Sequence, residues 1–306
     1  MRAEVHRIMI ARIVLLASLL TPALAGAQAA PSTDIYLIPI TVSARDTATL
    51  VAGSPINVTH RAGYDNQPAF APDGRTILYT STRDDGQADI YRYDIARRRT
   101  SRVTSTPESE YSPTFIPGTR RFSVVRVERD STQRLWSFAI DGSDPRLVLR
   151  TIKPVGYHAW LDTAHVALFV LGKPATLQVA TLGTEHVDTV ARDIARSLVS
   201  AGVRSASFAQ RQPDTNLVLT RLELDPASAR SRVTPVGTMP KGAEFVAWTP
   251  TGAALTASGS RLFILQPGHR EWEQVVDLAA DGIANVTRLA ISPNGRWLAV
   301  VADDGR

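Results

Sequence analysis

A repeat of about 45 residues is the sequence feature that most restricts how this chain can fold. Six segments of the 306-residue chain each place a large apolar residue at the same point of the repeat, at intervals of 45, 45, 48, 40 and 43 residues. These anchor residues are Phe70, Phe115, Trp160, Phe208, Trp248 and Ile291. A repeat of this length accommodates four short strands, which is one blade of a propeller. The repeat therefore predicts an all-β fold, a six-bladed β-propeller.

Each anchor is expected to end an inner strand that a tight turn follows. The tripeptides Pro72-Asp73-Gly74 and Pro293-Asn294-Gly295 suit such turns, because Pro fixes φ, Asp or Asn bonds the backbone, and Gly accepts positive φ. Aliphatic second strands follow, such as RTILYTS and RWLAVVA. In the first of these repeats, DDGQADIYRYDI predicts a hairpin and a third strand, and TSRVT predicts the fourth.

The hairpin after RTILYTS carries three carboxylates close together, Asp84, Asp85 and Asp89. Such a cluster could bind calcium. However, Asp303-Asp304-Gly305 recurs at the same point of the last repeat. We therefore interpret the cluster as turn chemistry and predict no metal site there.

The last repeat contains only its first two strands, and the N-terminal part of the chain supplies the others. The segments DIYLIPI and LVAGSPINVT match the third and fourth strands of a blade. Val58-Thr59 and Val103-Thr104 lie equally far before their anchors, Phe70 and Phe115. This spacing supports the assignment of the N-terminal segments to the end of a repeat. We therefore expect N-terminal outer strands to pair with C-terminal inner strands in one blade and close the ring.

The fifth repeat fits this pattern least well. In DTVARDIARSLV, the apolar residues Val190, Ile194 and Leu198 are four positions apart behind a residue suited to capping, Asp188. This spacing predicts a short inserted helix. Phe208 is expected to end the inner strand that follows.

Residues 1–27 are predicted to be a signal peptide, and residues 28–306 a single propeller domain. Three arginines precede the apolar run IVLLASLLTPALA, and small residues allow cleavage after Ala27 or Ala29. This run is shorter than the roughly 20 residues of a membrane-spanning helix, and no later segment is longer and uncharged. Because the chain has no cysteine, we expect neither a lipid anchor nor disulfides. The predicted location is the periplasm.

The repeat resembles that of the TolB-type propellers, a WD40-like β-propeller family. The matching stretches are FAPDGRTILYTS, ADIYRYDI, ISPNGRWLAVVA and DIYLIPI. This resemblance implies a six-bladed propeller and a docking role in the Tol-Pal envelope system. It covers the propeller alone, since the periplasmic TolB protein carries an α/β domain before its propeller, whereas this sequence is expected to enter its first blade near Asp34.

Catalytic and cofactor motifs are absent from the sequence. It contains no Gly-x-Ser-x-Gly, His-Glu-x-x-His, P-loop or dinucleotide-binding glycine motif, and its histidines have no short metal-binding spacing. We therefore predict no catalytic residue, cofactor or metal. The formal charge of +5 falls to about +3 without residues 1–27, which is too small to indicate a nucleic-acid partner.

The loops before the anchor strands are expected to surround the mouth of the central channel, where propellers bind partners. The predicted partner-binding residues are Asp65, Glu110, Tyr111, Tyr157, His158, Arg204 and Glu244. The predicted function is that of an exported, non-catalytic scaffold that binds an envelope protein, a peptide or another ligand. The alternative is a channel-site hydrolase of the lactonase or glycosidase type, with Glu110 and Glu244 as a carboxylate pair.

Overall fold

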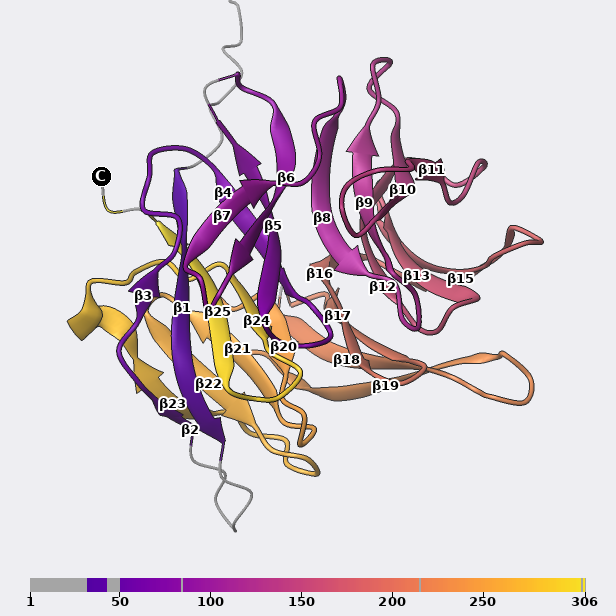
Figure 1. Ribbon diagram of the computed structural model, residues 1–306. Coiled ribbons are helices and arrows are strands. Elements are labelled where there is room, and N and C mark those ends of the chain that lie inside the picture. Colours follow the sequence, from indigo (N-terminus) through magenta and orange to yellow (C-terminus); the bar gives the residue numbers. More distant parts are fainter. Residues whose placement is uncertain (1–31, 43–49, 84, 215, 304, 306) are drawn as a thin grey trace, which may run out of the picture. The chain divides into compact units, whose positions relative to one another are not determined.

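Six antiparallel sheets, each built on four strands, are arranged as a ring of blades (Figure 1). The computed structural model describes residues 32–42, 50–83, 85–214, 216–303 and 305. All of them belong to one compact unit, Pro31–Arg306. The predicted all-β, six-bladed propeller is therefore confirmed, whereas the signal peptide predicted for residues 1–27 lies outside the described residues.

Blades 1 to 3 follow the order of strands that the repeat predicts, from the channel outward. Blade 1 consists of β24 (Arg288–Ile291), β25 (Trp297–Asp303), β1 (Thr33–Val42) and β2 (Leu50–Ala52), and β3 (Ile56–Asn57) also pairs with β1. Blade 2 consists of β4 (Asp65–Phe70), β5 (Thr76–Thr82), β6 (Ala88–Asp94) and β7 (Arg99–Arg102). Blade 3 consists of β8 (Ser109–Phe115), β9 (Arg121–Val127), β10 (Gln133–Ala139) and β11 (Arg146–Leu147).

Blades 4 to 6 have the same arrangement. Blade 4 consists of β12 (Val155–Trp160), β13 (His165–Val170), β14 (Thr176–Thr181) and β15 (His186–Arg192). Blade 5 consists of β16 (Ile194–Gly202), β17 (Ser205–Arg211), β18 (Leu217–Leu224) and β19 (Ser231–Thr238). Blade 6 consists of β20 (Val246–Trp248), β21 (Ala254–Ser258), β22 (Arg261–Leu265) and β23 (Glu273–Asp277), followed by a short 3₁₀ helix, η1 (Leu278–Asp281). In the described part of the chain, no helix has the length and apolar character needed to cross a membrane.

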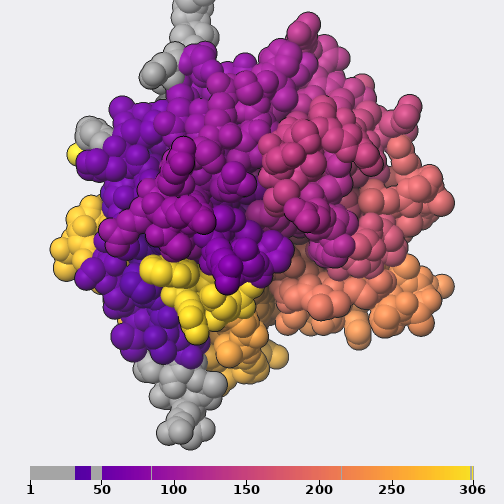
Figure 2. Space-filling model, in the orientation of Figure 1, coloured from indigo at the N-terminus to yellow at the C-terminus, as the bar shows by residue number. Residues whose placement is uncertain are grey.

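Blade 1 closes the ring with strands from the two ends of the sequence. Strand β1 is antiparallel to β25 from the pair Thr33 and Asp303 to the pair Pro39 and Trp297. In Figures 1 and 2, the indigo N-terminal strands accordingly lie beside the yellow C-terminal ones. The predicted mixed blade is confirmed, and its pairing joins the first and last repeats through main-chain hydrogen bonds.

The core lies between the faces of neighbouring blades. The second strand of a blade has another blade packed against each of its faces, so the middle of β5 and of β9 is buried throughout rather than at alternate residues. This explains why apolar residues are adjacent in these strands, as in Ile77-Leu78-Tyr79 and Val124-Val125, instead of alternating strictly with polar ones. Phe122 and Phe138 stack with their ring centroids 5.5 Å apart in one of these layers.

The turns after the inner strands use the predicted residues. Gly74 and Gly295 both have φ of 67°, a conformation that Gly adopts without steric cost. Asp73 Oδ1 accepts a hydrogen bond from the backbone N–H of Arg75 at 2.9 Å. Asn294 Oδ1 does the same for Arg296 at 3.1 Å. These side chains therefore fix the turns that follow Phe70 and Ile291.

The prediction for blade 5 is wrong in two respects. The predicted helix is instead the end of β15 and the start of β16, and Phe208 lies in the second strand, β17, rather than at the end of the inner strand. A bulge explains the error: Ile194 pairs with Gln210 and Leu198 with Phe208, so a step of four residues on β16 matches a step of two on β17. Both apolar residues of β16 are buried at a spacing of four, which imitates a helical period.

Candidate functional site

A cavity of about 270 Å³ lies at the centre of the ring and is lined from all six blades. Its lining segments, taken from blade 2 around to blade 1, are residues 67–69, 112–114, 157–159, 198–200, 245–248 and 288–291. Because the inner strands all run in one direction, their first residues gather at one face of the ring, which we call the start face. The turns that follow the inner strands gather at the other, which we call the turn face.

Arg288, at the beginning of β24, is held between aromatic rings at the start face. Its guanidinium lies 4.0 Å from the ring centroid of Phe245 and 5.0 Å from that of Tyr157. Its Nη2 also donates a hydrogen bond of 2.9 Å to the hydroxyl of Tyr157. Among the described residues, no carboxylate forms an ion pair with Arg288. The channel therefore contains a half-buried cation that aromatic faces stabilise without neutralising it.

Arg196 and Glu244 form a neutral pair beside Arg288. The carboxylate of Glu244 accepts hydrogen bonds from Arg196 Nη2 at 2.7 Å and from its backbone N–H at 3.0 Å. Although burial raises the pKa of Glu244, these hydrogen bonds hold it below its usual value, so the carboxylate is ionised. The Arg196 guanidinium also lies 5.6 Å from the centroid of Phe245. Two arginines thus face one aromatic ring, and the carboxylate beside them is bound by Arg196 alone.

Tyrosines complete the start face on the side of blades 2 to 4. Burial raises the pKa of Tyr64 to about 12, and this hydroxyl lies close enough to Tyr111, Tyr157, Arg196 and Arg288 for all four to influence it. The group therefore contains one residue from each blade. We call it the mouth ring: Tyr64, Tyr111, Tyr157, Arg196, Phe245 and Arg288.

Of the residues predicted from the sequence, Tyr111 and Tyr157 belong to the mouth ring, and Glu244 lies beside it. The other four are elsewhere. Asp65, Glu110 and His158 are buried in the body of the blades. Arg204 lies in the turn between β16 and β17, on the turn face.

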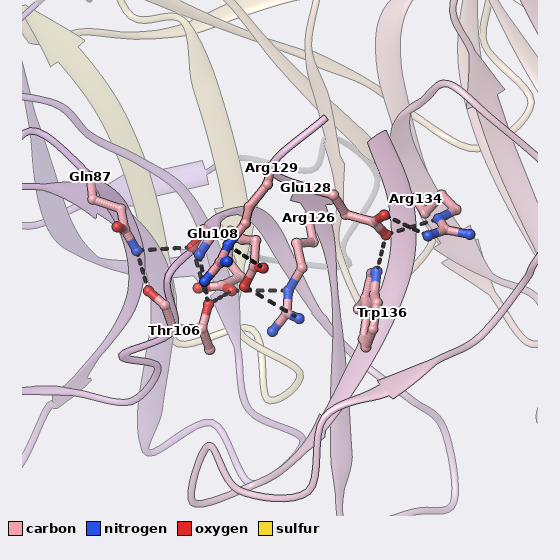
Figure 3. Close-up of polar contacts among 9 residues, drawn as sticks. Gln87, Thr106, Glu108, Arg126, Glu128, Arg129, Arg134 and Trp136 are labelled. Atoms are coloured by element: carbon pink, nitrogen blue, oxygen red, sulfur yellow. Dashed lines mark hydrogen bonds and ion pairs between the residues drawn. The ribbon is translucent and has the colours of Figure 1, made fainter. Parts of the chain in front are cut away.

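Glu110 is fully buried in β8 and does not face the channel mouth. Its Oε1 accepts hydrogen bonds from Thr106 Oγ1 and from Arg126 Nε, the latter at 3.2 Å. The Arg126 guanidinium also lies over the ring of Trp136, at 4.3 Å from its centroid. Figure 3 shows Thr106, Arg126 and Trp136 with the polar contacts around them. Because burial outweighs these hydrogen bonds, the pKa of Glu110 rises to about 7.

Asp65 ties blade 2 to its neighbour from a fully buried position. Its Oδ2 accepts a hydrogen bond from Arg61 Nη1 at 2.8 Å, and its backbone carbonyl accepts one from Thr33 Oγ1 at 2.9 Å. Burial raises the pKa of Asp65 despite hydrogen bonds from Ser81 and Arg61 that lower it. This carboxylate therefore has a structural role between blades 1 and 2.

His158 borders the channel but its imidazole is almost completely enclosed. Its Nε2 lies 2.6 Å from Ser123 Oγ, which also accepts a hydrogen bond of 2.8 Å from Trp160 Nε1. Burial lowers the pKa of His158 to about 3, so the ring is neutral near pH 7. His158 and Ser123 thus link blades 3 and 4 through uncharged groups.

Arg204 stabilises a turn on the face opposite the mouth ring. It forms an ion pair with Asp162 of the β12–β13 turn and donates a hydrogen bond of 3.2 Å to the carbonyl of Leu224. The sequence predicts a position at the channel mouth for Arg204 because Phe208 is expected to end an inner strand, which is wrong. Because β16 is the inner strand of blade 5, Arg196 is the residue that this blade contributes to the mouth ring.

Sequence reasoning missed four members of the mouth ring: Tyr64, Arg196, Phe245 and Arg288. A signal for two of them is present, because Tyr157, Phe245 and Arg288 each lie three positions before an anchor. Arg196 has no such signal, because the bulge in β16 changes the number of residues between the start of the inner strand and its end.

The two carboxylates proposed as an acid/base pair have separate partners. Glu110 is held by Arg126 in blade 3, and Glu244 by Arg196 of blade 5. Among the described residues, no group of three or more His, Asp or Glu side chains is arranged to hold a metal ion.

The ring and its channel define a six-bladed β-propeller with an aromatic and arginine-rich mouth. Solved TolB structures share this fold. A protein assigned as TolB from Agrobacterium tumefaciens has a TM-score of 0.66 and 14% identity over 89% of this chain and 98% of its own. TolB from Acinetobacter baumannii has a TM-score of 0.54 and 14% identity over 89% of this chain and 63% of its own. The fold is thus that of the TolB-type propellers, as the sequence resemblance implied.

An enzyme with the same architecture is also similar. A gluconolactonase from Xanthomonas campestris has a TM-score of 0.59 and 10% identity over 90% of this chain and 97% of its own. No protein-family model matches the sequence. At these identities the likeness establishes the fold alone, so function has to be argued from the site.

Proposed function

We propose that this protein is an exported, non-catalytic scaffold of the bacterial periplasm that binds an envelope protein or peptide at its start face. The observation that carries the proposal is the mouth ring, in which each of the six blades contributes one aromatic or arginine side chain. Three of these side chains, Tyr157, Phe245 and Arg288, also line the channel cavity. Tyrosine and arginine are the residue types that dominate binding energy at protein interfaces. The fold it shares with TolB supports a docking role, and the arginines and apolar run of residues 1–27 support export.

The start face is a better docking surface than the turn face for a physical reason. Tyr157, Phe245 and Arg288 are at least half-buried and contact one another, so a partner would immobilise few free rotamers of these side chains on binding. Tyr157, for example, packs edge-on against Phe169 with the ring centroids 5.6 Å apart. On the turn face, Arg75 and Arg296 are exposed without any ion pair among the described residues, so ordering them would cost more conformational entropy.

The hydrolase alternative has less support from the side chains. Its acid and base would be Glu110 and Glu244, and each of these carboxylates is already bound by its own arginine. Glu110 is also fully buried away from the mouth ring. A channel enzyme would need a different pair of groups.

A pull-down from envelope extract tests the proposal with tagged chain 28–306. The informative variant is Tyr64→Ala/Arg196→Ala, which removes two members of the mouth ring. We expect the wild-type chain to capture one envelope protein reproducibly and the double variant to lose most of it.

The matched control is Arg75→Ala/Arg296→Ala, which removes two exposed side chains on the turn face. This variant should capture the same protein in the same amount as the wild type. Equal capture by the mouth variant, with loss in the turn-face variant, would place docking on the other face and refute the proposal.

A further inference from the structure

We propose that the central channel binds a ligand with a carboxylate on an apolar body, and that Arg288 holds the carboxylate. This inference rests on the proposed function and names the chemistry of the ligand at the same face. Three features of the structure support it: the charges around Arg288, the contacts that hold its guanidinium, and the lining of the cavity.

Within the mouth ring, Arg288 is a cation without a carboxylate partner among the described residues. Arg196 and Arg288 both face the ring of Phe245, at 5.6 and 4.0 Å from its centroid. Glu244 is the carboxylate beside them, and it is bound to Arg196 through the guanidinium and the backbone N–H. Among the described residues Arg288 has no carboxylate partner. An anionic group entering the channel would therefore meet an uncompensated positive charge.

The Arg288 guanidinium is already oriented for such a contact. Stacking on Phe245 and Tyr157 fixes its plane, and the hydrogen bond to the Tyr157 hydroxyl fixes its rotation. A guanidinium has five N–H donors in a planar fork, and this bond uses one of them. The described residues accept no hydrogen bond from the others. A carboxylate is the planar group that matches two such donors at once.

The cavity next to Arg288 suits an apolar group. Pro68, Pro113, Leu198, Leu289 and Ile291 contribute to its lining, and its volume is about 270 Å³. Polar groups at its margin include Gln67, whose Oε1 is occupied by hydrogen bonds from Thr80 Oγ1 and the backbone N–H of Ser112. A ligand that places its carboxylate at Arg288 can thus bury an apolar body in the same cavity.

Two sources can supply this chemistry: the C-terminal residue of a peptide and a free apolar carboxylic acid. Two probes distinguish them, acetyl-Ala-Ala-Leu and acetyl-leucine, each used with a free carboxylate and as the amide. Titration calorimetry on purified chain 28–306 gives the affinity of each. We expect both acids to bind saturably and their amides to bind roughly tenfold more weakly or worse. Tighter binding of the tripeptide would assign the site to a peptide end, and equal binding to a free acid.

Variants at Arg288 test which side chain is responsible. Arg288→Ala should weaken binding of the acids by roughly tenfold or more. Arg288→Lys, which keeps the charge and the core packing but loses the planar fork, should give an intermediate loss. Arg296→Ala removes an arginine from the other end of the same hairpin and should bind like the wild type. Circular dichroism of each variant confirms that the propeller is folded.

Three outcomes would overturn the inference. They are no saturable binding of either acid at ligand concentrations up to about 10 mM, equal affinity for acid and amide, and unchanged affinity in Arg288→Ala. Because this experiment uses no envelope partner, such a result would leave docking of a folded protein at the start face intact. Conversely, failure of the pull-down alone would leave the carboxylate site standing.

Discussion

Arg288 Nη2 donates a hydrogen bond of 2.9 Å to the hydroxyl of Tyr157, a residue 131 positions away in the sequence. Arg288 belongs to blade 1 and Tyr157 to blade 4, and these blades are opposite each other in a ring of six. The two side chains therefore form a link across the channel. This link joins the blade that closes the ring to the far side of the molecule, at the point where we place ligand recognition.

This link should contribute a measurable coupling energy. We expect a double-mutant cycle of Tyr157→Phe and Arg288→Ala to give a coupling of about 0.5–1.5 kcal/mol in the free energy of unfolding, the usual contribution of one intramolecular hydrogen bond. Urea unfolding of the wild type, both single variants and the double variant provides the four values. Additive effects would mean that the two side chains do not interact in solution.

Glu110 should make the protein less stable as the pH rises toward neutrality. Burial raises its pKa from 4.5 to about 7 in the folded chain, so between these values the folded state retains a proton that the unfolded state has lost. The stabilisation from this proton is complete below the unfolded pKa and is lost as the pH rises through the folded one. The free energy of unfolding should therefore fall by up to about 1.4 kcal/mol per pH unit in this interval.

The variant Glu110→Gln isolates this effect from that of other groups. Glutamine is neutral at every pH, and its carbonyl can still accept the hydrogen bonds from Thr106 and Arg126. Between about pH 4.5 and 7, the free energy of unfolding of the wild type should thus fall relative to that of the variant as the pH rises. Parallel stability curves over that range would show that Glu110 ionises normally.

His158 should remain neutral at physiological pH. Burial lowers its pKa to about 3, and its Nε2 lies 2.6 Å from Ser123 Oγ. We expect its imidazole NMR signals, assigned by comparison with His158→Gln, to stay constant between about pH 5 and 8. A titration with its midpoint near the ordinary value of about 6.5 would show that the side chain reaches solvent.

The closing blade should be as important for stability as the continuous ones. Ile38 of β1 and Leu298 of β25 are fully buried and directly opposite each other. Substitution of either by Ala should lower the free energy of unfolding by about 2–5 kcal/mol. Val51→Ala, at a β2 side chain that is 63% exposed, should change it by less than about 0.5 kcal/mol. An unaltered urea midpoint for Ile38→Ala would contradict the pairing of β1 in the ring.

The fold could be predicted because local chemistry repeats along the sequence. Turns such as Pro72-Asp73-Gly74 recur after the anchors, and the two ends supply complementary halves of one blade. Blade 5 could not be predicted in the same way. Its bulge gives Ile194 and Leu198 a helical spacing within a strand, and only pairing with β17 reveals the difference.

The candidate site was harder to predict than the fold. Tyr157 could be predicted because its position relative to Trp160 is regular. In blade 5, the wrong assignment of Phe208 to the inner strand led to Arg204 instead of Arg196. The sequence also could not reveal that Glu110 and His158 are buried. That depends on contacts from other strands: Arg126 in β9 for Glu110, and Ser123 of the neighbouring blade for His158.

Site-specific photocrosslinking in living cells tests binding at the channel mouth most directly, because it shows which face of the propeller contacts a partner. A photoreactive residue replaces Tyr64 in the mouth ring in one strain and Val203 in another. Val203 is 93% exposed in the turn between β16 and β17, so it reports on the turn face. We predict that position 64 crosslinks to a discrete envelope protein or peptide and that position 203 does not. Crosslinks from position 203 alone would contradict binding at the channel mouth.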